Sequence, residues 1–265
     1  TGCGAMVLGC LLLPGDLQAW QPAGAAGVDQ QVWRQDLQAS GQPRRVLAVQ
    51  DIEADDMDYW APVLPALPPL TRWMALLQRG TEQRLQATTL EPARPGQAPR
   101  MPGLVDSADD QLLYLLEHPS LRAGTVRQAR AQGHLAGHDP GQPDLPARLQ
   151  LGQRTYRLGQ DCQRRSHSTE VEGGRIDHHV CALWIEHEGL RQPLGSAWYS
   201  AEPDSDSFNG EVRLRWAGDL DGDDRLDLIV DYQRKSCINT WLYLSGSAAA
   251  AALAAPVGWD SYCGC

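Results

Sequence analysis

A mainly β fold, with an antiparallel, β-rich C-terminal domain, is the fold class that this sequence predicts. Two observations carry the prediction. Apolar and polar residues alternate over short segments of the second half, which is the period-2 pattern of strands with one buried face. Glycine-containing turns separate these segments at hairpin spacing. We therefore expect hairpins of consecutive strands in this half of the chain, with the alanine run at residues 248–252 as either a short helix or a surface loop.

Hairpin patterns are clearest in the C-terminal half. Residues 148–160 alternate around a Gly-Gln turn, and residues 178–199 are typical of a hairpin that turns near Glu188 and Gly189. Residues 238–246 form a further predicted strand.

The segment GEVRLRWAG shows the most regular alternation in the chain. Because side chains of a strand point to opposite faces in turn, we expect Val212, Leu214 and Trp216 on one face. Arg213 and Arg215 are then expected on the other face.

The N-terminal region is predicted to be β-rich with one short helix. Its strand-like segments are residues 44–50, 82–92, 111–117 and 118–129, the last of them beginning with a turn. Residues 70–80 fit a short helix, because Trp73, Leu76 and Leu77 share one helical face and Gly80 lies at the stop position.

Changes in composition divide the chain into five parts. Residues 131–147 are rich in Gly and Pro and mark the main boundary. The predicted parts are a signal-peptide-like segment (1–25), a linker (26–43), an N-terminal β-rich region (44–130), a second linker (131–147) and a C-terminal β domain (148–265).

The first residues resemble an export signal. An apolar block at residues 5–13 is too short to span a bilayer, and small residues follow it, as before a signal cleavage site. We therefore expect a periplasmic or secreted protein without a transmembrane helix. A buried N-terminal strand is one alternative, and a lipid anchor on Cys10, in the lipoprotein-like segment VLGC, is another.

Net charge and cysteines agree with export. A formal charge of −10 argues against nucleic acid or an anionic membrane as the main partner. Five cysteines lie in the second half without a CxxC pair, so structural disulfides are expected. The favoured arrangement pairs Cys162 with Cys181, and Cys237 with either Cys263 or Cys265.

Five aspartates crowd into nine residues of the segment GDLDGDDRLDLIVDY. They are Asp219, Asp221, Asp223, Asp224 and Asp227. Carboxylates this close repel one another, and a divalent cation would offset the repulsion. The alternative is an acidic, solvated turn that holds no metal.

The spacing of these residues fits calcium. Calcium takes several oxygen ligands at about 2.3–2.6 Å, and loops of the EF-hand type supply them from alternate positions and from the seventh backbone carbonyl. With Asp219 as position one, the ligands are Asp221, Asp223 and Asp227 at positions three, five and nine, and the carbonyl of Arg225. The twelfth position is a valine, so a true EF-hand is not predicted.

The stretch GDLDGDDRLDLIV resembles the calcium-binding motif of FG-GAP and VCBS repeats, which occur in integrin α propellers and many exported bacterial proteins. The resemblance covers about 15 residues in a single copy, so it implies a calcium loop entering a strand and not a propeller. The motif has glycine at position six, where this chain has Asp224. That position usually needs a positive φ, which Asp tolerates at some cost.

Other polar clusters carry weaker signals. Candidate acidic turns lie at residues 51–58 (Asp51, Glu53, Asp55, Asp56) and 203–210 (Asp204, Asp206), and histidine clusters at His134 and His138 and at 177–181. We interpret them as solvated turns and ordinary histidines. Ser196 and Ser247 lie beside glycines, but neither has an adjacent base or a G-x-S-x-G elbow.

Two functions are consistent with these features. The first is an exported, non-enzymatic binding or structural protein whose calcium ion stabilises a β-turn, with an envelope or extracellular protein or a glycan as its partner. The alternative is a secreted hydrolase in which calcium is purely structural. The first is favoured, because no catalytic motif is found in the sequence.

Overall fold

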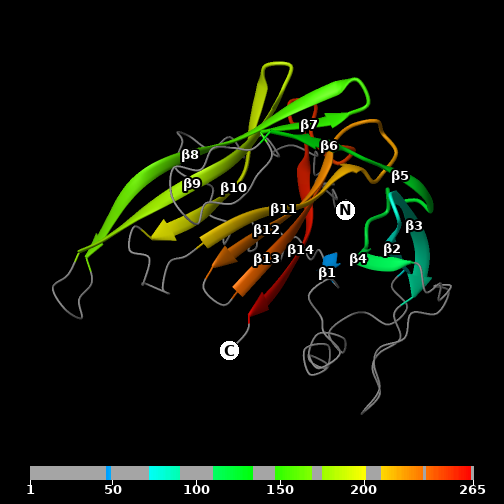
Figure 1. Cartoon of the computed structure of the whole chain (residues 1–265), viewed down its shortest axis with the longest axis horizontal. Coiled ribbons are helices and arrows are strands. Elements are labelled where there is room, and N and C mark those ends of the chain that lie inside the picture. The colour runs from blue at the N-terminus through cyan, green and yellow to red at the C-terminus, as the bar shows by residue number, and fades with distance from the viewer. Residues whose placement is uncertain are drawn as a thin grey trace, which may run out of the picture.

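The computed structural model describes seven stretches of the chain: residues 46–48, 72–89, 110–133, 147–168, 175–200, 210–234 and 237–263. These residues form two antiparallel sheets and contain no helix, which confirms the mainly β prediction (Figure 1). The strands are β1 (Val46–Ala48), β2 (Arg72–Arg79), β3 (Glu82–Thr89), β4 (Gln111–Leu116), β5 (Gly124–Gln128), β6 (Arg130–Gln132), β7 (Arg148–Leu151), β8 (Arg154–Ser168), β9 (Arg175–His187), β10 (Leu190–Ser200), β11 (Gly210–Asp219), β12 (Asp227–Arg234), β13 (Cys237–Leu244) and β14 (Ala255–Cys263).

The larger sheet has nine strands and curls into a half-barrel. Its strand order is β1-β4-β2-β3-β5-β11-β12-β13-β14, and the two outermost strands, β1 and β14, lie against each other. The smaller sheet, in the order β10-β9-β8-β7-β6, crosses the outer face of β11–β14. Figure 1 shows its long β8–β9 hairpin extending well beyond the larger sheet.

Strands β12 and β13 are buried on both faces, because a core lies on each side of them. Leu228 and Val230 pack into the core between the two sheets, and Ile229, between them in sequence, packs into the core inside the half-barrel. In β13, Trp241 and Leu242 are divided in the same way. A strand buried on both faces needs apolar residues at nearly every position, which explains the unbroken apolar runs in this part of the sequence.

The predicted helix at residues 70–80 is wrong. Arg72–Arg79 is a strand that pairs with β3 on one side and β4 on the other, and Trp73 to Leu77 are buried in sequence without a gap. A short, continuous apolar run fits a buried strand as well as a helix, and periodicity alone does not separate them. Gly80, expected as a helix stop, begins the two-residue turn to β3 with a φ of 59°.

A β-bulge changes the predicted face of β11. Val212 and Leu214 pack toward the core between the sheets as expected, but Trp216 packs inside the half-barrel. The register to β12 shifts between Leu214 and Trp216, so Arg215 is the extra residue that reverses the alternation. The indole N–H of Trp216 donates to the side-chain oxygen of Gln83 at 2.7 Å.

Both predicted turns of the smaller sheet are confirmed. Gly152, with a φ of 56°, turns the chain from β7 to β8. Glu188 and Gly189 connect β9 to β10, with φ values of 50° and 79°. Two successive left-handed residues match the twist of the flanking strands.

The half-barrel includes strands from both predicted regions. Strand β5 pairs with β11 through two residue pairs, Gln128 with Gly218 and Arg127 with Asp219. A side chain at Gly218 would collide with the carbonyl oxygen of Arg127, so glycine permits this approach. The division at residues 131–147 remains a prediction.

The signal-like segment, the linker that follows it and most of residues 131–147 lie outside the described residues. Among the residues that the structure describes, no helix is long and apolar enough to cross a membrane.

Candidate metal centre

The turn between β11 and β12 brings three carboxylates together. Asp219, the last residue of β11, and Asp227, the first of β12, flank the turn, and Asp221 lies within it. Each of the three offers an oxygen within 4.8 Å of the others, which is a spacing that one cation can bridge.

Asp219 folds the loop around its own carboxylate. One oxygen, Oδ1, accepts hydrogen bonds from the backbone N–H groups of Gly222 at 2.7 Å and Asp223 at 3.1 Å, and Oδ2 accepts from Asp224 at 3.2 Å. The side chain is 5% exposed. These bonds curl the backbone, so the first aspartate shapes the loop in addition to supplying oxygens.

Asp227 joins the loop to the end of β13. Its Oδ2 accepts from the backbone N–H of Leu220 at 2.6 Å, and its Oδ1 accepts from the backbone N–H of Ser245 at 2.7 Å and from the Ser245 hydroxyl at 2.9 Å. The residue is 0% exposed. Burial raises the pKa of Asp227 to about 7, although the hydrogen bonds from Ser245 and Leu220 lower it.

Asp221 carries the oxygen that is left without a partner. Its Oδ1 is buried and has no hydrogen-bond donor. Its other oxygen, Oδ2, lies against Gly246, where any side chain would collide with it. Burial raises the pKa of Asp221, and the negative charges of Asp223 and Asp219 raise it further. A buried, unpartnered carboxylate oxygen is costly unless a cation or donor meets it.

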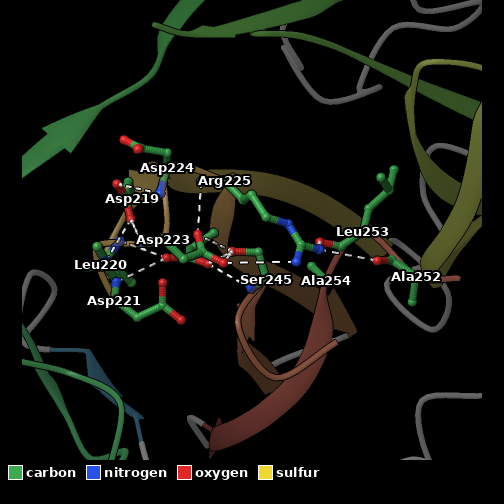
Figure 2. Close-up of polar contacts among 12 residues, drawn as sticks. Asp219, Leu220, Asp221, Asp223, Asp224, Arg225, Ser245, Ala252, Leu253 and Ala254 are labelled. Carbon is green, nitrogen blue, oxygen red and sulfur yellow. Dashed lines mark hydrogen bonds and ion pairs between the residues drawn. The ribbon is translucent and has the colours of Figure 1, made fainter. Parts of the chain in front are cut away.

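Asp223 is held by a second segment of the chain. The hydroxyl of Ser245 lies 2.9 Å and 3.0 Å from its two oxygens, and the backbone N–H of Arg225 donates to Oδ1 at 2.8 Å. The guanidinium of Arg225 lies 4.0 Å from Oδ2 of Asp223 and donates to the carbonyls of Ala252 and Leu253, both at 3.3 Å (Figure 2). Ligation by Asp223 and by the Arg225 carbonyl remains a prediction.

The sequence did not predict a role for Arg127. Its positive charge offsets part of the repulsion among the aspartates. Its guanidinium, on β5, donates to Oδ2 of Asp219 at 2.8 Å and also contacts the carboxylate of Asp224. The hydrogen bond to Asp219 is the main cause of the raised pKa of Arg127. Only the pairing of β5 with β11 brings these residues together, and they lie 92 positions apart in sequence.

Ser245 and Gly246 were also missed, and here the sequence carried a signal. The segment LSGS lies at the end of a predicted strand, and a glycine next to a small hydroxyl residue is typical of a tight turn. The structure places this turn over the acidic loop, where it contacts Asp221, Asp223 and Asp227.

Asp224, which replaces the glycine at position six of the calcium motif, has the positive φ that this position was expected to need. Asp224 has a φ of 63°, in the left-handed region, and its side chain is 71% exposed and directed away from the loop interior (Figure 2). Aspartate tolerates this region better than most residues that have a side chain. The loop therefore takes its turn without the glycine.

The residues of the turn fit a hard divalent cation. The donor set is oxygen-only, three carboxylates converge, and one of their buried oxygens lacks a partner. Asp219, Asp221 and Asp227 would hold the ion.

Ser247 has a histidine neighbour that the sequence did not predict. Nε2 of His118 lies 3.4 Å from the Ser247 hydroxyl in an exposed contact, and Nδ1 of the same ring lies 2.8 Å from the Ser120 hydroxyl and 3.3 Å from the Ser120 backbone nitrogen. Ser196 is buried in β10.

The remaining sequence candidates lie outside the described residues. These are the acidic segments 51–58 and 203–209, and His134 and His138. His178 and His179 lie on β9, where the backbone alone is described.

Among the residues whose side chains the structure describes, two cysteines form a disulfide, and the pair is a predicted one. Cys162 on β8 and Cys181 on β9 are directly opposite in the register and are joined, with their Cα atoms 4.0 Å apart. This confirms that at least two of the five cysteines are bonded, and it indicates an oxidising compartment.

Comparisons with known proteins add no relative: no family model, no curated protein and no solved structure matches the chain.

Proposed function

We propose that this is an exported, non-enzymatic binding or structural protein that holds one calcium ion in the turn between β11 and β12. The proposal is supported mainly by the convergence of Asp219, Asp221 and Asp227, in which one buried oxygen of Asp221 has no hydrogen-bond donor. The ion stabilises the turn by offsetting the repulsion among these carboxylates.

Calcium is favoured over magnesium by the number of available oxygens. Asp223 and the Arg225 carbonyl, added to the three converging carboxylates, supply at least five oxygens from one loop. Calcium takes 6–8 oxygens in adaptable geometry, whereas magnesium needs a near-ideal octahedron and retains its waters. The resemblance of the loop to FG-GAP and VCBS motifs supports the same ion.

A structural role for the ion is supported by its surroundings. Asp227 and Asp219 are almost fully buried, and the turn at Ser245 and Gly246 covers the loop. The hydrolase alternative has the exposed Ser247–His118 contact at 3.4 Å as its support, which is weaker than the support that the buried carboxylates give to a structural ion.

A place outside the cytoplasm is supported by the disulfide between Cys162 and Cys181 and by the signal-like start of the sequence. We propose a periplasmic or secreted protein whose partner is an envelope or extracellular protein or a glycan. Affinity capture from the envelope fraction, with and without calcium, tests the partner.

Calcium is tested by melting the purified full chain in excess chelator and then with calcium or magnesium added, together with metal analysis of the untreated protein. At a calcium concentration about 100 times the dissociation constant, binding to the folded state alone should add about 2.7 kcal/mol to the free energy of unfolding. Magnesium should add less.

Matched variants make this test specific. Asp221→Ala should abolish the calcium-induced shift, whereas Asp161→Ala, which removes an exposed carboxylate from the smaller sheet, should leave it unchanged. A melting temperature that calcium does not move, with no calcium in the untreated protein, would leave the loop as an acidic turn only.

A further inference from the structure

Two cysteines outside the described disulfide lie directly opposite each other. The register of β13 and β14 pairs Cys237, the first residue of β13, with Cys263, the last of β14. The same relation, between opposed residues of neighbouring antiparallel strands, holds for Cys162 and Cys181, which are bonded.

We infer that Cys237 and Cys263 form a second cross-strand disulfide, which fastens the last strand of the half-barrel to its neighbour. Directly opposed residues of antiparallel strands have Cα atoms about 4.5–5.5 Å apart, and disulfides need about 4.4–6.8 Å. The backbone register therefore places this pair within bonding range whichever type of opposed pair it is.

The register also selects Cys263 over Cys265. Cys263 is the residue that the register sets opposite Cys237, whereas Cys265 lies two positions beyond the last paired residue of β14. The sequence had left both cysteines open as the partner of Cys237, and Cys265 is now expected to keep a free thiol.

The bond forms by a balanced thiol–disulfide exchange. The thiolate of one cysteine attacks the disulfide of an oxidoreductase in the exporting compartment, and the second thiolate then displaces the enzyme from the mixed disulfide. Two thiols lose two protons and two electrons, and the enzyme's disulfide is reduced to a dithiol.

The position of the bond gives it a structural consequence. Among the described strands, β14 lies at one end of the strand order and is hydrogen-bonded only to β13. It lies against β1 at the point where the half-barrel comes closest to closing (Figure 1). An edge strand with one partner frays first, and a link at its end resists this. The inference does not depend on calcium.

Peptide mapping of the full chain, purified in its oxidised form, tests the inference. Free thiols are alkylated in denaturant without reductant, and the protein is then cut with trypsin. Because residues 236–265 contain no Lys or Arg, one peptide carries Cys237, Cys263 and Cys265. The expected result is one alkyl group on this peptide, at Cys265.

Single variants identify the bond independently of the mapping. Cys263→Ser should leave Cys237 open to alkylation and lower the melting temperature by about 5–10 °C. Cys265→Ser should keep the bond and change the melting temperature by less than about 2 °C.

Alkylation of Cys237 in the oxidised wild-type protein, or its bonding to any cysteine other than Cys263, would overturn the inference. Loss of the bond in Cys265→Ser would do the same. If Cys263→Ser does not fold, the mapping of the wild type and of Cys265→Ser still decides the question.

Discussion

The β9–β10 turn of the smaller sheet and the β11–β12 turn of the larger sheet are stabilised in different ways. The β9–β10 turn uses two residues, Glu188 and Gly189, and their left-handed backbone alone matches the twist of the strands. The β11–β12 turn uses the seven residues from Leu220 to Leu226, and carboxylates hold it by accepting backbone N–H groups.

This difference shows that a longer turn needs side chains to accept its backbone N–H groups. In the two-residue turn the strands satisfy the backbone groups, so the side chains are free to vary. In the longer loop the backbone N–H groups need acceptors, and Asp219 and Asp227 supply them from buried positions. The longer turn is therefore expected to be sensitive to side-chain substitution and to metal, and the shorter turn to backbone conformation only.

Asp227→Ala should have the largest effect on stability. The change leaves the backbone N–H groups of Leu220 and Ser245 without their acceptor in a buried site, whereas the Ser245 hydroxyl keeps Asp223 as its acceptor. Each orphaned donor costs about 1–3 kcal/mol, and relief from burying a charge offsets part of the sum. We expect a net loss of about 3 kcal/mol in urea unfolding with chelator present.

Asp223→Ala provides the comparison for Asp227→Ala, because Asp223 is more exposed and accepts from fewer buried donors. It should cost about 1 kcal/mol under the same conditions. Equal losses for the two variants would contradict the distinction between a buried anchor and a peripheral one.

Replacing both Cys162 and Cys181 by Ala tests the contribution of a disulfide cross-link, which does not depend on metal. The bond closes a loop with a sequence separation of 19, for which about 3 kcal/mol of stabilisation is expected. The double variant should unfold at lower urea, while the shift caused by calcium stays the same, since the two sites lie in different sheets. A changed calcium shift would show that the sheets are coupled.

Arg127→Gln should have a smaller effect on the long turn. The guanidinium is 52% exposed, so its ion pairs with Asp219 and Asp224 are screened by solvent, and we expect a loss of about 1 kcal/mol without calcium. Arg157→Gln is the matched control, because it breaks an exposed pair with Glu186 in the smaller sheet and should cost less than about 0.5 kcal/mol. Similar losses would mean that Arg127 has no special role at the loop.

Glu188→Asn should have the smallest effect, and the opposite sign. Asparagine adopts a positive φ more readily than glutamate, and Asn-Gly is the preferred pair for this turn. We expect a gain of about 0.5 kcal/mol in urea unfolding, whereas Glu188→Val, which is β-branched, should be destabilising. A loss with asparagine would mean that the Glu188 side chain stabilises the short turn.

Much of this molecule could be predicted from local sequence, because local chemistry decided it. The two-residue turns at Gly152 and at Glu188 and Gly189 follow from glycine flanked by alternating residues. The acidic loop, its entry into β12 and the positive φ at Asp224 follow from the spacing of the aspartates.

The errors arose where the surroundings decided between two locally acceptable structures. Trp73 to Leu77 fit either a helical face or a strand buried on both sides, and pairing with β3 and β4 selected the strand. Trp216 lies on the opposite face from the one predicted, because a bulge at Arg215 reverses the alternation of side chains. A regular alternation of apolar and polar residues in the sequence does not indicate where a bulge occurs.

The turns, strands β7 to β10 and the acidic loop could be predicted from the sequence, since these depend on residues a few positions apart. Strand β6 was missed because it overlaps the predicted linker, and the surroundings of the acidic loop depend on tertiary contacts. Arg127 reaches Asp219 from a strand 92 positions away, and Ser245 and Gly246 cover the carboxylates from the end of β13. The order of nine strands in one half-barrel brings these segments together, and that order depends on contacts between residues far apart in the chain.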